Sequence, residues 1–100
     1  MAARKRARAE RRQLDRDLQK LIDAREKLAR LEPGGEPLRP IEVASASVIE
    51  VRALSHRCPA CDGELRVHEH RAVRDLREVE LRCKQCGRPR TLWFRVALPS

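Results

Sequence analysis

The chain has 100 residues, of which 38% are charged and 2% aromatic, and its formal net charge at pH 7 is +8. A chain of this size and composition holds one small domain plus an extension, and it needs a metal or disulfide bonds to offset chain entropy. No stretch approaches the roughly 18 apolar residues of a membrane span, and no apolar run follows the basic N-terminus as in a secretory signal. We therefore expect a cytoplasmic protein without membrane contact, whose basic charge favours polyanions such as nucleic acid.

The first third of the chain is predicted to be a basic amphipathic helix, residues 1–32. Residues 1–30 contain 11 Lys/Arg and 5 Asp/Glu but no Gly or Pro, and most of their side chains favour helices. We expect the helix to run from about Arg4 to Leu31 and to end at Pro33-Gly34-Gly35. Its basic end either forms a solvated face or contacts phosphates. The predicted nucleic-acid contacts in this segment, here called the basic arm, are Arg4, Lys5, Arg6, Arg8, Arg11 and Arg12.

A stripe of leucines follows on the same helix. The leucine stripe consists of Leu14, Leu18, Leu21 and Leu28, and Ile22 and Leu31 flank it. Their helical spacing places them on one side of the helix. A heptad pattern adds Arg11 and Arg25 to this seam, which makes a weak coiled coil. The stripe therefore packs on the chain's own connector and metal domain, pairs with a second copy, or binds a protein partner.

Residues 33–55 are predicted to be a linker with short β segments. The prolines of this region favour an extended backbone. Two segments rich in β-branched residues follow, Ile41-Glu42-Val43 and Val48-Ile49-Glu50-Val51. We predict two short strands or one interrupted strand, which can add an edge to the sheet of the metal domain.

Two Cys-x-x-Cys pairs contain all the cysteines of the chain. They are Cys58-Pro59-Ala60-Cys61 and Cys83-Lys84-Gln85-Cys86. In a reducing compartment such pairs indicate metal ligands, and a closed shell of four thiolates predicts one structural Zn²⁺. Gly63 and Gly87 are expected to supply the left-handed backbone of each metal-binding turn. Two disulfides, an iron site of rubredoxin type and a redox-active thiol pair are the alternatives.

The remaining chemistry-bearing side chains predict no enzyme. His56, His68 and His70 are not expected to be ligands, because four cysteines already complete the shell. We find no nucleophile–base arrangement, no paired catalytic carboxylates and no phosphate-binding loop, and we expect no small-molecule substrate.

Alternating apolar residues predict three strands, around residues 65–67, 79–81 and 92–96. The tip of the first hairpin is expected near residues 72–76. Phe94 is predicted to lie in the core. Its neighbour Trp93 is predicted on the opposite face of the sheet, where it covers the helix or contacts a partner.

Cys-Pro-x-Cys-x-Gly, a hairpin, Cys-x-x-Cys-Gly and a third strand together resemble the zinc-ribbon superfamily over residues 56–98. The resemblance implies a three-stranded antiparallel zinc ribbon, and together with the predicted helix it gives a small α+β zinc-binding protein with a long N-terminal helix followed by this ribbon. It also implies that Cys58, Cys61, Cys83 and Cys86 are the ligands. Members of this superfamily serve in transcription machinery, in ribosomal proteins and translation factors, and as structural modules of enzymes.

The order of helix and four-cysteine finger is also similar to that of the DksA/TraR-type regulators of RNA polymerase. Those proteins place a two-helix coiled coil with an acidic tip before the finger. Here residues 41–53 look β-like, and Pro33-Gly34-Gly35 lacks the acidic pair of that tip.

We therefore predict a non-enzymatic zinc-ribbon adaptor for nucleic acid or for a protein associated with nucleic acid, in transcription or translation. It would act through the basic arm, and Arg88, Arg90 and Arg95 would add contacts from the ribbon. The alternative is a zinc-stabilised scaffold that uses the leucine stripe to bind a protein partner or to form a homodimer.

Overall fold

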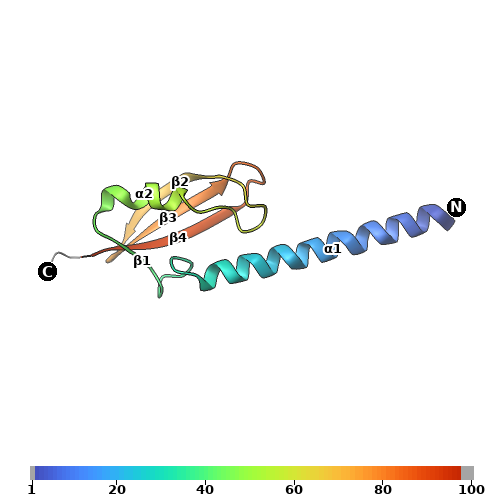
Figure 1. Ribbon diagram of the computed structural model, residues 1–100, viewed down its shortest axis with the longest axis horizontal. Coiled ribbons are helices and arrows are strands. Elements are labelled where there is room, and N and C mark those ends of the chain that lie inside the picture. Colours follow the sequence, from blue (N-terminus) through green and yellow to red (C-terminus); the bar gives the residue numbers. More distant parts are fainter. Residues whose placement is uncertain (1, 98–100) are drawn as a thin grey trace.

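The computed structural model describes residues 2–97, and it consists of one long helix joined to a small domain built on a sheet (Figure 1). Helix α1, Ala2–Leu31, projects from this domain and gives the molecule a length of 72 Å against a width of 23 Å. This confirms the predicted helix. Residue 98, the last of the predicted ribbon, lies outside the described residues. Within residues 2–97 no helix is both long and apolar enough to cross a membrane.

The sheet has four strands, in the order β1-β4-β3-β2. Their bounds are Ile41–Val43 for β1, Leu65–Val73 for β2, Leu76–Cys83 for β3 and Pro89–Val96 for β4. The last three strands pair antiparallel, as predicted, whereas β1 runs parallel to β4. The prediction of a three-stranded, wholly antiparallel sheet is therefore wrong. The fourth strand forms because Ile41 and Val43 are both buried while Glu42 between them is exposed, which is the alternation of a half-buried edge strand.

The segment after β1 is helical. A 3₁₀ turn, η1 (Ala46–Val48), leads into helix α2 (Ile49–Leu54), so the predicted strand at residues 48–51 is wrong. Ile49 and Ala53 are 0% exposed, whereas Val51 is 71% exposed. This pattern fits a helix and not a strand, because in a strand Val51 would lie on the same face as Ile49 and Ala53. Packing on the sheet thus overrides the β propensity of the branched residues.

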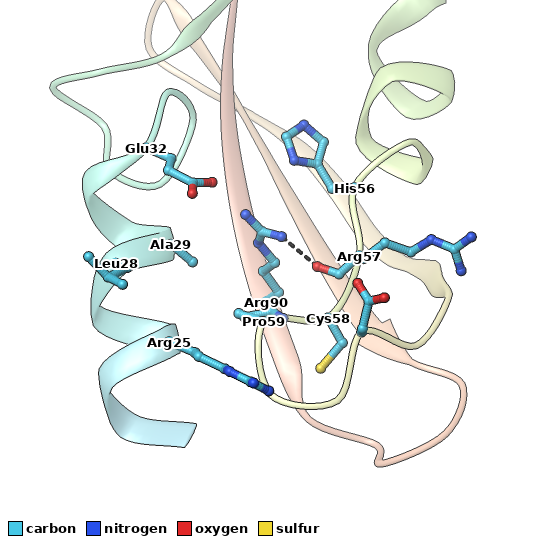
Figure 2. Close-up of a pocket in the computed structure, with 10 residues that line it drawn as sticks. Arg25, Leu28, Ala29, Glu32, His56, Arg57, Cys58, Pro59 and Arg90 are labelled. Atoms are coloured by element: carbon cyan, nitrogen blue, oxygen red, sulfur yellow. Dashed lines mark hydrogen bonds between the residues drawn. The ribbon is translucent and has the colours of Figure 1, made fainter. Parts of the chain in front are cut away.

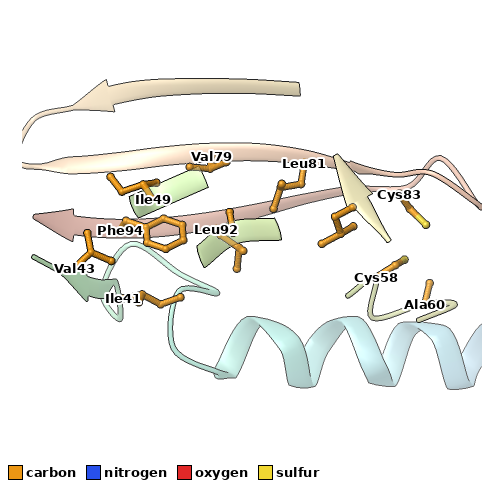
Figure 3. Close-up of a cluster of buried hydrophobic side chains, with 12 residues drawn as sticks. Ile41, Val43, Ile49, Cys58, Ala60, Val79, Leu81, Cys83, Leu92 and Phe94 are labelled. Atoms are coloured by element: carbon orange, nitrogen blue, oxygen red, sulfur yellow. The ribbon is translucent and has the colours of Figure 1, made fainter. Parts of the chain in front are cut away.

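The hydrophobic core lies between α2 and one face of the sheet (Figure 3). Its largest fully buried side chains are Phe94, Ile49, Leu81, Leu92 and Val79. The prediction that Phe94 is a core residue is confirmed. Cys58 and Cys83 lie at one end of the same core. Residues 41–53, predicted as a linker, therefore share a single core with the segment that carries the cysteines.

The opposite face of the sheet carries positive and negative side chains whose charges balance. Arg71 of β2 pairs with Glu78 of β3 at 2.8 Å, and Arg82 pairs with Glu80 at 3.0 Å. Trp93 is half-buried on this face, opposite Glu78 in the register of β3 and β4. Paired charges of both signs thus surround the only tryptophan.

Strand β2 forms one edge of the sheet and contains an irregularity. The register between β2 and β3 shifts between Val67 and Glu69, which marks a β-bulge. The residue at the shift, His68, is exposed. The hairpin that follows turns at Arg74, which has a left-handed backbone with φ of 57°, within the segment where the turn was predicted.

A short turn fixes α1 to the sheet. Gly34 has φ of 84°, and its carbonyl oxygen accepts a hydrogen bond of 2.8 Å from the backbone N–H of Trp93. A Cβ at this position would lie 2.7 Å from Ile41, so only glycine fits without a shift. Farther along, Glu26 of α1 pairs with Arg88 at 3.3 Å. The half-buried residues of this part of the helix, here called the docking face, are Ile22, Glu26 and Ala29.

Candidate metal centre

Two turns bring the four cysteine side chains together. The first cysteine turn, residues 57–64, precedes β2, and the second, residues 83–88, joins β3 to β4. The Sγ atoms of Cys58 and Cys86 lie 3.6 Å apart, and those of Cys61 and Cys83 lie 3.4 Å apart. All four sulfur atoms lie within 4.8 Å of one another. The predicted ligand set therefore forms a single cluster.

The cluster has the dimensions of a tetrahedral metal site. A tetrahedron with metal–sulfur bonds of about 2.3 Å places its sulfur atoms about 3.8 Å apart. The sulfur–sulfur distances here are close to that value and far longer than a disulfide bond of about 2.05 Å, and the cysteines are free thiols. An all-sulfur tetrahedron suits Zn²⁺ and iron. The four cysteines are thus positioned to bind a metal ion.

Backbone hydrogen bonds hold both turns in place. In the first turn the N–H of Cys58 donates to the carbonyl of Gly63 at 2.9 Å, and the N–H of Asp62 donates to the carbonyl of Cys58 at 2.8 Å. In the second turn the N–H of Gly87 donates to the carbonyl of Cys83 at 3.1 Å. Each turn therefore closes on its own backbone, which orients the paired thiols before a metal binds.

The two glycines serve different purposes. Gly87 has φ of 75°, which confirms the predicted left-handed residue of the second turn. In the first turn the left-handed residue is Asp62, with φ of 61°, and not Gly63. Gly63 is required for space, because a Cβ there would lie 2.8 Å from the Sγ of Cys83 and 3.2 Å from that of Cys61.

The ionisation of the thiols differs with their hydrogen bonds. The backbone N–H of Cys86, followed by that of Gln85, stabilises the thiolate of Cys83 and lowers its pKa to about 6. The hydrogen bond from Cys61 to Cys83 raises the pKa of Cys61 to about 12. Burial raises the pKa of Cys58. These hydrogen bonds favour a thiolate at Cys83 and a thiol at Cys61, and a metal held by four thiolates would release the thiol protons on binding.

A groove of about 580 Å³ separates α1 from the first cysteine turn (Figure 2). Arg90, on β4, lines this groove, and its guanidinium donates a hydrogen bond of 2.6 Å to the carbonyl of Arg57. Burial lowers the pKa of Arg90, while the charges of Glu32 and Cys58 raise it. Arg90 and Cys58 thus line the same groove, where the charges of Glu32 and Cys58 favour the charged guanidinium.

The histidines lie outside the cluster of the described residues. His56 is half-buried in the groove, where burial and then the charge of Arg90 lower its pKa. This favours the neutral imidazole. His68 is exposed and His70 half-buried, both on β2.

The nine arginines and lysines predicted to contact nucleic acid fall into two groups. Those of the basic arm are exposed on α1, and within residues 2–97 none of them has an ion-pair partner. The three on the sheet domain all have partners. Arg88 pairs with Glu26 at 3.3 Å, Arg90 bonds to the carbonyl of Arg57, and Arg95 lies 3.7 Å from a carboxylate oxygen of Asp75.

Sequence reasoning missed two contributions to this site. The spacing Cys-x-x-Cys-x-Gly indicated that Gly63 belongs to the turn, but its contact with the second cysteine pair depends on how the two turns meet. No sequence signal connects Arg90 with Arg57, which are 33 residues apart.

Comparison of the chain with protein-family models, with curated proteins and with solved structures gave no match. The geometry of the four cysteines therefore provides the functional evidence.

Proposed function

We propose that the chain is a structural zinc protein of zinc-ribbon type that binds nucleic acid, or a nucleic-acid-bound assembly, through the basic arm. The observation that carries this proposal is the position of the arm. It extends beyond the sheet domain on a helix of 30 residues, which is about 45 Å long, and no acidic side chain of the described residues neutralises it through an ion pair. The zinc would stabilise the domain, because four thiolates leave no coordination position for a substrate.

The distribution of charge around the helix supports the proposal. At about 100° per residue, Arg4, Arg8, Arg11 and Arg12 fall on one side of α1, away from most of the leucine stripe. A row of cations along one side of a helix follows the phosphates of a nucleic-acid backbone. On the charged face of the sheet, by contrast, Arg71 and Arg82 are ion-paired with glutamates, and the half-buried tryptophan lies opposite Glu78. The contacts are therefore assigned to the arm first.

Binding of the zinc-loaded full chain to labelled duplex DNA and to RNA, measured by fluorescence anisotropy over a series of salt concentrations, tests this proposal. We expect affinity to fall steeply with salt, because binding releases counterions from the phosphates. The double variant Arg8→Gln/Arg12→Gln should weaken binding about tenfold at low salt. It should also reduce the slope of log K against log salt by about 0.9 for each phosphate that the arm no longer neutralises.

The matched control is Arg52→Gln/Arg66→Gln, which removes the same charge from exposed positions on α2 and β2. It should leave the salt slope close to that of the wild type. Absence of binding to either nucleic acid, or an equal decrease of affinity in the two double variants, would contradict binding through the arm.

A second candidate function is protein interaction through the leucine stripe. The stripe is not covered by the chain's own domain, since its four leucines are 47–62% exposed. The interpretation that it packs on the connector and metal domain is therefore wrong. Large apolar side chains in a row on one helix indicate a site for another helix.

A further inference from the structure

The leucine stripe and the docking face lie on different sides of α1. The docking face, which contacts the sheet domain, lies roughly 90° around the helix from the stripe at about 100° per residue. The helix is therefore held by its own domain along one side while an adjacent apolar side remains open. Leu28 of the stripe borders the groove next to the first cysteine turn, so the domain does not block this side.

We propose that the leucine stripe pairs with α1 of a second copy of this chain, in antiparallel orientation. The inference deepens the second candidate function by naming its partner, and it does not depend on nucleic-acid binding. It rests on the arrangement of charges along the stripe, which suits one orientation of a second helix and opposes the other.

A parallel pair would place like charges together. In the heptad that puts Leu14, Leu21 and Leu28 at position d, Arg11 and Arg25 occupy position a. Position a faces its own counterpart in a parallel dimer, so each arginine would face the same arginine of the second copy. Across the flanking g and e positions, Glu10 would face Asp15. The pairs between two a positions and this pair between g and e would thus be repulsive.

An antiparallel pair places the same side chains opposite different ones. Position a then faces position d of the second helix, and centring the pair on Leu18 opposite Leu21 aligns Leu14 with Arg25. Arg25 of one copy then lies next to Asp15 of the other, and this attractive pair occurs twice by symmetry. The long apolar stem of arginine can cover leucine while its charged end reaches the carboxylate.

The ends of the helix are also complementary in this register. Arg8 near the N-terminus of one copy lies next to Glu32 at the far end of the other helix. Glu32 borders the groove beside the first cysteine turn, which leaves room for the arriving arm.

Sedimentation equilibrium of the zinc-loaded full chain, with the variants Asp15→Arg and Arg25→Asp and the double variant, tests both association and orientation. For the antiparallel pair, each single variant raises the dimer dissociation constant about tenfold, and the double variant restores it to within about threefold of the wild type, as a coupled pair requires. A parallel pair gives a different pattern, because Asp15→Arg would turn the repulsion with Glu10 into an attraction and tighten the dimer, whereas Arg25→Asp would only replace one like-charged pair by another.

Lys27→Asp is the matched control, since it makes the same charge change as Arg25→Asp at an exposed position on the far side of the helix. The dimer dissociation constant of Lys27→Asp should equal that of the wild type. Leu18→Glu should abolish the dimer without unfolding the domain, because Leu18 is exposed in the single chain. A wild-type chain that stays monomeric up to millimolar concentration, or a dimer that Asp15→Arg tightens, would overturn the proposal. Neither result would affect the nucleic-acid test.

Discussion

Gly63 connects the two cysteine turns at the scale of a single residue. Its α-carbon faces the sulfur atoms of Cys83 and Cys61, so the first turn leaves no space for a side chain between the pairs. The clustering of the four cysteines was predicted from the sequence, because the spacing of two Cys-x-x-Cys pairs is typical of a metal site. The role of Gly63 was not predicted, because it depends on how the two cysteine turns approach each other. Gly63 and Lys84, one from each turn, are separated by 20 residues in the sequence.

We predict that Gly63→Ala lowers zinc affinity at least tenfold, measured by competition with a chromophoric chelator. The added Cβ would lie 2.8 Å from the Sγ of Cys83, and the sulfur tetrahedron must expand to relieve this contact. Gly87→Ala provides the comparison, because its Cβ would meet nothing within 4 Å and only its left-handed backbone is strained. The Gly87 variant should lose about 1 kcal/mol of stability but less affinity. Equal zinc affinity in wild type and Gly63→Ala would show that the site tolerates the methyl group.

At the scale of elements, α1 and α2 illustrate what local sequence can and cannot specify. Helix α1 was predicted because it has good helix formers over 30 residues and a glycine-containing stop. Helix α2 was not predicted, because Val48, Ile49 and Val51 have high β propensity and the element has only 6 residues. Its state is decided by tertiary packing, since a helix buries Ile49 and Ala53 against the sheet while Val51 stays exposed. Strand β1 was predicted as an edge strand, but its parallel orientation relative to β4 was not, because no local sequence pattern encodes strand direction.

The helical assignment of α2 predicts different behaviour for two β-branched residues that lie two positions apart. Ile49→Ala should reduce the free energy of unfolding by about 2–5 kcal/mol, because it leaves a cavity in the core. Val51→Ala should change it by less than about 0.5 kcal/mol, because Val51 is exposed and alanine is the better helix former. Urea denaturation at saturating zinc measures both values. Large decreases for both variants would instead indicate a strand, in which residues two positions apart lie on the same face.

At the scale of the whole molecule, the cysteine cluster and the hydrophobic core are continuous. Cys58 and Cys83 belong to the same buried cluster as Ile41, Ile49 and Phe94, although the sequence suggested a separate linker before residue 56. Zinc binding at such sites contributes roughly 10–16 kcal/mol, most of it as folding free energy. A core this small has little stability of its own.

We therefore predict that chelation of zinc unfolds residues 41–96 as one unit, including β1 and α2. Residue-resolved hydrogen exchange measures this, and amide protection in β1, α2, β3 and β4 should disappear together. The N-terminal half of α1 serves as the internal reference, because it contacts no part of the sheet domain and its exchange should change little. Persistent protection of β1 and α2 after chelation would show that the metal stabilises only the cysteine turns.

The bulge in β2 also limits how copies of this protein can associate. An edge strand with unpaired backbone groups is a template for other strands, and natural proteins block such edges with bulges and charges. Strand β2 has a bulge between Val67 and Glu69 and exposed Arg66 and Arg71, while the opposite edge is a strand of only 3 residues that directly follows Pro40. Intermolecular sheet extension, and with it the route to fibrous aggregates, is thereby disfavoured at both edges.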